Sequence, residues 1–166
     1  MEPQCNFQLE LGGRKYKTTR IGNLLWMAEN LSLLVKESWF YDDNAIHGEK
    51  YGRLYTWKAA MDACPEGWRL PSKTDWEQMV EHLGGHITAF NNLTPGGTSG
   101  FNALFAGYRN LDGLFLSLGR AADFWTSTEA GKANAHLFYM IHKKETVFNI
   151  IDDKRCGFSV RYVKSF

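Results

Sequence analysis

The stretch ACPEGWRLPSKTDWEQMVEHLGG, residues 63–85, decides the fold class because it marks both ends of a helix. Ser72 is a favourable N-cap, and Asp75 follows three residues later, as in a capping box. The pair Gly84-Gly85 ends the helix, since glycine adopts the left-handed C-terminal conformation without a steric penalty. The apolar face between these signals consists of residues at helical spacing: Trp76, Met79, Val80 and Leu83.

A second helix is predicted just upstream, from Arg53 to Ala63. Leu54, Trp57 and Met61 repeat there at helical spacing, and Pro65 stops the run. Before it, the segment 41–52 is polar and turn-prone and is expected to be irregular. Further upstream two strand-like segments, 14–21 and 24–27, are separated by Gly22-Asn23, a pair typical of a hairpin turn.

Downstream of residue 85 the pattern changes to strands. The Gly-, Asn- and Thr-rich segment Asn91–Gly100 is expected to be an exposed loop. Phe158, Val160 and Tyr162 alternate as in a half-buried strand. The segments predicted as strands are 101–108, 114–118, 124–128, 135–142, 146–151 and 158–163. Two central helices with antiparallel strands on both sides predict an α+β fold, and 166 residues are enough for one domain, 1–166.

Composition excludes two classes of partner. The formal net charge is +1, and without a block of Lys and Arg we expect no nucleic acid partner. No apolar run approaches the ~20 residues of a membrane span, so we expect none. The first residues have no basic region followed by an apolar one, so either the protein is not exported by that route or a signal peptide has been removed.

Residues of the types that could bind a metal ion are few and do not form a recognisable motif. Cys5, Cys64 and Cys156 allow at most one internal bridge, fall short of a structural zinc site, and are equally compatible with reduced thiols. His82 and His86 are four residues apart, but Gly84-Gly85 between them should end the helix and separate the two rings. We therefore expect no metal and no cofactor. The acidic pairs 42–43 and 152–153 are interpreted as solvated turn residues rather than a calcium site.

Several phrases, in order along the chain, closely resemble the Fibrobacter succinogenes major paralogous domain family. The resemblance runs from about Gly13 to Lys164. The phrases are GNLLWMAENL (22–31), YGRLYTW (51–57), ACPEGWRLPS (63–72), FNAL (101–104), GYR (107–109), WTSTE (125–129) and GFSVR (157–161). The passage around residues 67–77 is also similar to formylglycine-generating enzymes and to the variable proteins of diversity-generating retroelements.

These resemblances imply a C-type-lectin-like fold, with two helices, paired terminal strands and long upper loops that carry binding. Members of the family often carry a cysteine where this chain has Tyr162, so a bridge to Cys64 is missing here. Cys156 could replace it, or Cys64 could be free. A bridge would contribute about 3–4 kcal/mol in the loop-entropy description. Oxidase chemistry of the formylglycine-generating kind needs two neighbouring cysteines, which the sequence does not place together.

We therefore expect a non-catalytic module that binds a protein or glycan ligand. The expected surface combines the Asn91–Gly100 loop, the Arg109–Asp112 turn and the Ala130–Ala135 segment. Its candidate binding residues are Asn110, Arg120, Trp125, Lys132 and Asn134, with Trp125 beneath the others. The alternative is a structural domain of a bacterial surface or adhesion assembly. Either role fits a secreted, surface-displayed or lipoprotein form; the oligomeric state stays open.

Overall fold

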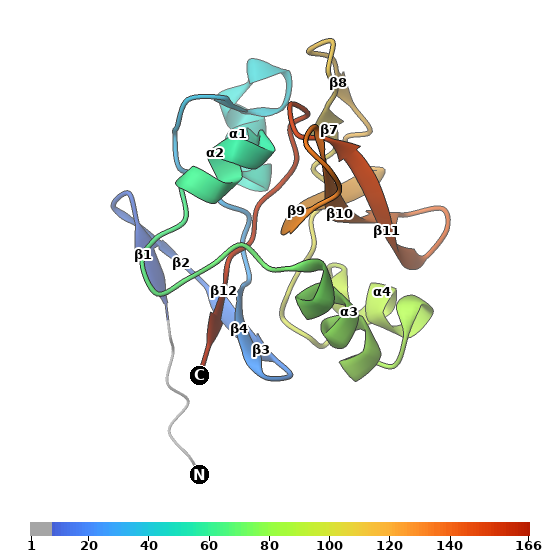
Figure 1. Cartoon of the computed structure of the whole chain (residues 1–166). Coiled ribbons are helices and arrows are strands. Elements are labelled where there is room, and N and C mark those ends of the chain that lie inside the picture. Colours follow the sequence, from blue (N-terminus) through green and yellow to red (C-terminus); the bar gives the residue numbers. More distant parts are fainter. Residues whose placement is uncertain (1–7) are drawn as a thin grey trace.

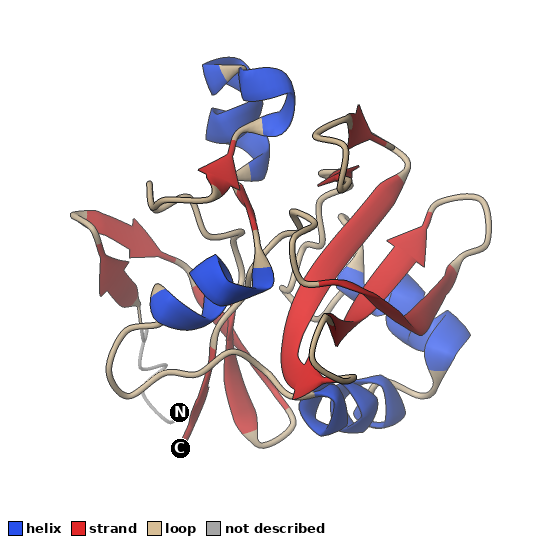
Figure 2. Ribbon diagram, turned by 45° about the horizontal axis from the view of Figure 1, so that its top comes forward, coloured by secondary structure: helices blue, strands red, loops and turns tan. Residues whose placement is uncertain are grey.

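The structure, a computed structural model, describes residues 8–166, so Cys5 lies outside the described part. It is a mixed α+β fold, as predicted, but residues 8–166 contain four α-helices instead of the two expected, and short strands are joined by long loops (Figures 1 and 2). The helices are α1 (Ala45–Tyr51), α2 (Trp57–Asp62), α3 (Lys73–His82) and α4 (His86–Leu93), preceded by a 3₁₀ turn at Tyr41–Asp43. Within residues 8–166, no helix combines the length and the apolar character that a bilayer crossing requires.

One three-stranded sheet joins the two ends of the chain, in the order β12-β4-β3. Strands β3 (Thr18–Ile21) and β4 (Leu24–Met27) form the predicted hairpin, with Ile21 opposite Leu24 across the Gly22-Asn23 turn. Strand β12 (Val163–Ser165) lies antiparallel to β4 on its other edge (Figure 1). A small hairpin of β1 (Leu9–Leu11) and β2 (Arg14–Tyr16) precedes this sheet.

A second three-stranded sheet has the order β11-β10-β9. It is built from β9 (Ala121–Glu129), β10 (Asn134–Ile141) and β11 (Thr146–Asp153), close to the predicted strands. Helices α3 and α4 cover one face of it (Figure 1). The predicted capping box of α3 is present: the Ser72 side chain accepts from the Asp75 N–H, and the Asp75 carboxylate accepts from the Ser72 N–H. The smaller pairs are β5 (Ser38–Trp39) with β6 (Leu54–Tyr55) and β7 (Tyr108–Arg109) with β8 (Phe115–Leu116).

Aromatic side chains fill the core, which consists of two clusters. Trp76 of α3 lies fully buried in the first, with its ring stacked on Phe138 of β10 at 5.2 Å between centroids. Trp26 of β4 meets the edge of Trp76 at 5.3 Å. The second cluster lies on the other face of the β9–β11 sheet and centres on Trp125 and Phe158, 4.7 Å apart. These contacts fix the two sheets relative to each other.

Two predictions for residues 41–63 are wrong: the start of one helix, and the absence of another. The helix expected from Arg53 begins only at Trp57, because the preceding pair, Leu54–Tyr55, is strand β6. Thr56 caps α2 by accepting a hydrogen bond from the Ala59 N–H, which sets the start of the helix. The segment 41–52, expected to be irregular, contains α1, whose N-cap Asn44 accepts from the Ile46 N–H at 2.9 Å.

Three downstream predictions also need correction. The expected loop 91–100 begins inside α4, since Ala89, Phe90 and Leu93 pack into the first core cluster. Segment 101–108 is largely irregular and only its last residue belongs to a strand. The predicted half-buried strand 158–163 is a series of isolated bridges that is buried on both sides, because the chain here passes between the two sheets.

Candidate functional site

A groove of about 430 Å³ opens where four segments distant in the sequence meet. We call it the Asn30 groove. It is bordered by β2, by the residues after β4, by the C-terminal end of α1, and by segment 100–104. Its lining is Arg14, Lys17, Ala28, Glu29, Asn30, Glu49, Lys50, Tyr51, Gly52, Gly100, Asn102 and Leu104. Polar and charged side chains therefore dominate the groove.

Close backbone contacts hold the groove together. Gly52 ends α1 at φ +75°, and a Cβ there would lie 2.6 Å from the carbonyl oxygen of Leu31. Only glycine accommodates both the left-handed backbone and this contact. The buried Asn30 side chain donates to the Tyr51 carbonyl at 2.9 Å, which ties the end of α1 to the residues after β4. Asn102, a non-glycine residue at φ +54°, presents an exposed side chain at the opposite border.

Arg161 lies directly beneath the groove and is 1 % exposed. Its guanidinium donates to Asn30 Oδ1 at 2.8 Å, to the Asn102 carbonyl at 3.0 Å, and to the carbonyls of Phe101 and Met27. The guanidinium carbon, Cζ, lies 4.3 Å from the centre of the Phe101 ring. Burial lowers the pKa of Arg161 to about 9, because the charged form has lost its hydration. The floor of the groove is therefore a rigid, positively charged network.

The charges on the rim are unevenly paired. Glu29 uses both carboxylate oxygens, one 3.1 Å from Arg14 Nη2 and the other accepting from the Lys17 N–H at 2.6 Å. The side chains of Lys17, Glu49 and Lys50 are exposed, and none has an ion-pair partner among residues 8–166. Lys50 lies 5.0 Å from the centre of the neighbouring Tyr51 ring. The rim thus offers two unpaired ammonium groups and one unpaired carboxylate.

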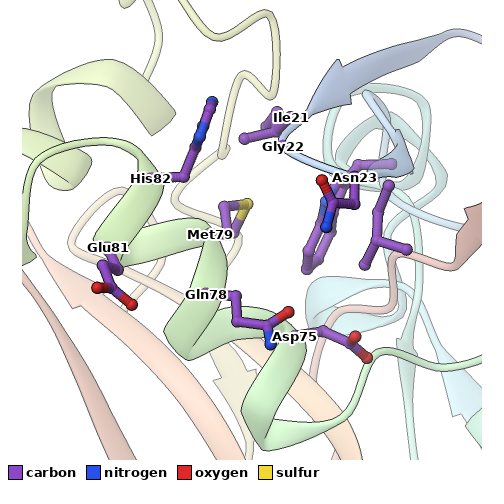
Figure 3. A pocket seen from close by; sticks show the side chains of 10 residues that line it. Ile21, Gly22, Asn23, Asp75, Gln78, Met79, Glu81 and His82 are labelled. Atoms are coloured by element: carbon purple, nitrogen blue, oxygen red, sulfur yellow. The ribbon is translucent and has the colours of Figure 1, made fainter.

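A smaller cavity of about 260 Å³ separates the β3–β4 hairpin from α3. Figure 3 shows Asn23 and Met79 pointing into this space, whereas the Glu81 carboxylate points away from it. Trp26, which is 1 % exposed, closes the inner end. His82 of α3 lies at the border. Gly84-Gly85 ends α3 after His82, as predicted, but His86 begins a second helix, α4, with its ring bonded to the Val147 carbonyl.

An ionisable group also lies buried away from both cavities. Asp123 of β9 is 4 % exposed, and its Oδ2 has no hydrogen-bond partner among the described residues. Burial, together with a smaller effect of the nearby Asp152 carboxylate, raises the pKa of this carboxyl to about 8. Asp123 is therefore protonated at neutral pH and is a core group rather than a surface anion.

Two of the predicted binding residues serve the scaffold. Trp125 is fully buried, and its indole N–H donates to the Tyr55 carbonyl at 2.8 Å, so it has no surface to offer a ligand. This corrects its assignment as a binding residue. Asn110 accepts hydrogen bonds from the backbone N–H groups of Asp112 and Leu114, so its side chain shapes the β7–β8 turn.

The other predicted residues do not form one surface. Arg120 precedes β9, whereas Lys132 and Asn134 follow it, so the nine-residue strand separates them by about 30 Å. The 130–135 segment and the 109–112 turn do come near each other, because both border the Lys154–Gly157 turn. The Asn91–Gly100 segment lies elsewhere, with the Ser99 carbonyl bonded to Thr19 of β3.

The cysteines within residues 8–166 are both free. Cys64 is half-buried after α2, and Cys156 is buried beside Asp152, whose carboxylate lies 3.7 Å from the sulfur. Burial raises the pKa of Cys64 to about 11 and that of Cys156 to about 12. Of the alternatives that the sequence left open, the structure contains the reduced one. No group of three or more His, Cys, Asp or Glu side chains in the described part is arranged to hold a metal ion.

Sequence reasoning missed the groove because its residues are distributed over several phrases. Asn30, Gly52, Asn102 and Arg161 each belong to one of the phrases that carry the family resemblance, and none of them was among the candidate binding residues. One signal was available. Arg161 stands between Val160 and Tyr162 in an apolar stretch, and a charge in that position must find buried partners.

The family model described as Fibrobacter succinogenes major domain matches residues 19–164. No curated protein matches the chain, and no solved structure does.

Proposed function

The chain belongs to the Fibrobacter succinogenes major domain family, and we propose that it is a non-catalytic binding module whose ligand lies in the Asn30 groove. The observation that carries this proposal is that the groove combines a floor held by hydrogen bonds with a rim of exposed polar side chains. The floor is fixed by the Arg161 network, while exposed polar side chains surround a volume of about 430 Å³. The volume falls within the usual range of ligand pockets, and the mainly polar lining fits a polar ligand.

A rigid floor favours binding because little conformational entropy is lost when a ligand arrives. Hydrogen bonds hold the segments that border the groove: Asn30 bonds the end of α1, Arg161 bonds Asn102 of segment 100–104, and β2 pairs with β1. The ligand is a protein segment or a glycan, presented to a secreted or surface-displayed domain. A C-type-lectin-like arrangement is part of this proposal, and the antiparallel pairing of β12 with β4 supports it.

The state of the thiols supports binding over oxidase chemistry. The thiolate is the form that attacks substrates and binds metals. Burial keeps the pKa values of Cys64 and Cys156 far above neutrality, so both are protonated. They also have different neighbours, the Pro65 carbonyl for Cys64 and the Asp152 carboxylate for Cys156.

A glycan and peptide array tests the proposal. Asn102→Gly is the informative variant, because it removes an exposed side chain from the groove, and glycine tolerates the same left-handed backbone. Ligands retained by the unmodified protein should be lost by this variant and kept by Lys132→Ala and Asn134→Ala. The opposite pattern moves the site to the connection between β9 and β10 and refutes the groove.

The second candidate function, assembly, is favoured by one specific observation. The β7–β8 hairpin exposes Leu111, Leu114 and Leu116, with Leu114 58 % exposed. Apolar side chains gathered in this way are typical of protein contacts. Size-exclusion chromatography with light scattering decides: a defined oligomer that dissociates on Leu114→Asp supports assembly, and a monomer at all concentrations contradicts it.

A further inference from the structure

We propose that the Asn30 groove selects a ligand that carries a carboxylate, and that this ligand is an acidic saccharide built from uronic acid units. The inference rests on the proposed function and names the ligand class for the same groove. Three features carry it: the unpaired cations on the rim, the buried cation in the floor, and the main chain of Lys17, whose N–H and C=O groups are both already hydrogen-bonded.

The rim supplies the first feature. Arg14 is neutralised by Glu29, which it contacts at 3.1 Å, so this pair contributes little net field. Of the remaining charged side chains, Lys17 and Lys50 are positive and only Glu49 is negative. Both ammonium groups are exposed and without an ion-pair partner among the described residues, and so they are available to an anionic ligand. Charge-assisted hydrogen bonds to a carboxylate are the strongest contacts that such a rim can make.

The floor supplies the second feature. Arg161 is fully buried, and within residues 8–166 all its hydrogen-bond acceptors are neutral oxygens, one from Asn30 and the others from main-chain carbonyls. Its charge is thus satisfied by hydrogen bonds to neutral oxygens. The Glu29 carboxylate attracts it electrostatically but is not hydrogen-bonded to it, and this carboxylate is already engaged by Arg14 and the Lys17 N–H. Two of the groups that bind it, Asn30 and Asn102, also line the groove. In a medium of low effective dielectric constant this positive charge acts on whatever occupies the groove.

The chemistry of the lining favours a saccharide over a peptide. An extended peptide binds by adding a strand, which needs free main-chain N–H and C=O groups. At Lys17 both are already used, the N–H by Glu29 and the carbonyl by the Ala28 N–H at 2.8 Å. What remains is a set of side chains able to donate to and accept from hydroxyl groups, with Glu49 and Asn102 exposed among them. Hydroxyls together with a carboxylate are what a uronic acid presents.

Isothermal titration calorimetry with the full chain tests the inference. The probes are oligogalacturonate, an alginate oligomer and a hyaluronan oligomer, each compared with its methyl ester, which keeps the shape and loses the charge. We expect at least one acidic probe to bind and its neutral counterpart to bind at least about tenfold more weakly. The affinity should also fall with added salt, because exposed charges are screened. A poly-glutamate peptide forms a further arm.

Variants locate the binding. Lys17→Gln combined with Lys50→Gln should weaken binding of the acidic probe by about tenfold or more. The control Lys15→Gln, two residues earlier on β2 and outside the groove lining, should change it less than about twofold. Equal binding of acidic and neutral probes, abolished by Asn102→Gly, overturns the charge inference and leaves the proposed function standing. Failure of every acidic saccharide to bind, or binding of poly-glutamate alone, overturns the saccharide class.

Discussion

Replacing Asp123 by asparagine should change how the stability of the protein depends on pH. The carboxyl is buried in β9 with one oxygen unpartnered among the described residues, and burial raises its pKa from 3.8 to about 8. Asparagine has nearly the same shape and does not titrate. The comparison therefore isolates the energetic effect of a single proton.

The direction follows from proton linkage. Between pH 3.8 and about 8 the folded protein holds a proton that the unfolded chain releases. The stability from this group is fully present below the unfolded pKa and is lost as the pH rises through the folded pKa. The slope in this window is about 1.4 kcal/mol per pH unit. Relative to the unmodified protein, Asp123→Asn should thus gain about 4 kcal/mol of unfolding free energy between pH 4 and pH 7, an upper bound for a group with this shift.

Urea unfolding at a series of pH values, followed by tryptophan fluorescence, measures the difference. A constant offset reports the hydrogen bonds of the new amide, whereas the slope against pH reports the lost titration. Asp112→Asn, at an exposed position in the β7–β8 turn, is the control and should leave the slope of the unmodified protein intact. If the curves for Asp123→Asn and the unmodified protein run parallel from pH 4 to pH 8, the carboxyl is not buried as described, and the reasoning fails.

Three further substitutions test the scaffold. Arg161→Lys should lower the free energy of unfolding by about 3 kcal/mol, since an ammonium cannot reproduce the forked contacts, and a loss under about 1 kcal/mol in urea titrations would contradict the buried network. Gly52→Ala should lower the free energy of unfolding by about 2 kcal/mol or more, because the new Cβ meets the Leu31 carbonyl. The control Gly131→Ala, at φ +97° with no atom within 4 Å of the new Cβ, should lower it by only about 1 kcal/mol. Equal shifts in thermal midpoint would show that the close contact is unimportant. Ser72→Ala removes the N-cap of α3 and should cost about 1 kcal/mol, seen as an earlier thermal midpoint; an unchanged midpoint would mean that the cap does not stabilise the helix.

Local signals predicted part of the fold well. The capping box of α3 and the Gly22-Asn23 turn are each complete within a few residues, so neighbouring sequence is sufficient to specify them. Where prediction failed, a distant partner decided. Leu54–Tyr55 continues a helical pattern in the sequence, but it pairs with Ser38–Trp39 and becomes strand β6. Helical spacing is a weak preference, and tertiary contacts override it.

For the candidate site, too, neighbouring residues allowed some predictions, and distant partners decided the rest. Exposed loops such as 130–135 could be recognised from composition, because small polar residues and glycine have little to bury. Composition could not show which of those loops lie together in space. The nine residues of strand β9, for example, hold Arg120 far from Lys132. Trp125 was expected beneath the binding surface and was counted among its candidate residues, but its packing against Phe158 and its full burial place it in the core.

The sequence by itself determined the family, the α+β class and the helix signals of α3, because each depends on residue order along a short stretch. The Asn30 groove was decided by the tertiary structure alone. Its floor joins Asn30 to Arg161, which are 131 residues apart in the chain, through a hydrogen bond of 2.8 Å. A contact of that kind has no local signature, since what brings the two residues together is the pairing of the chain's ends around a shared core.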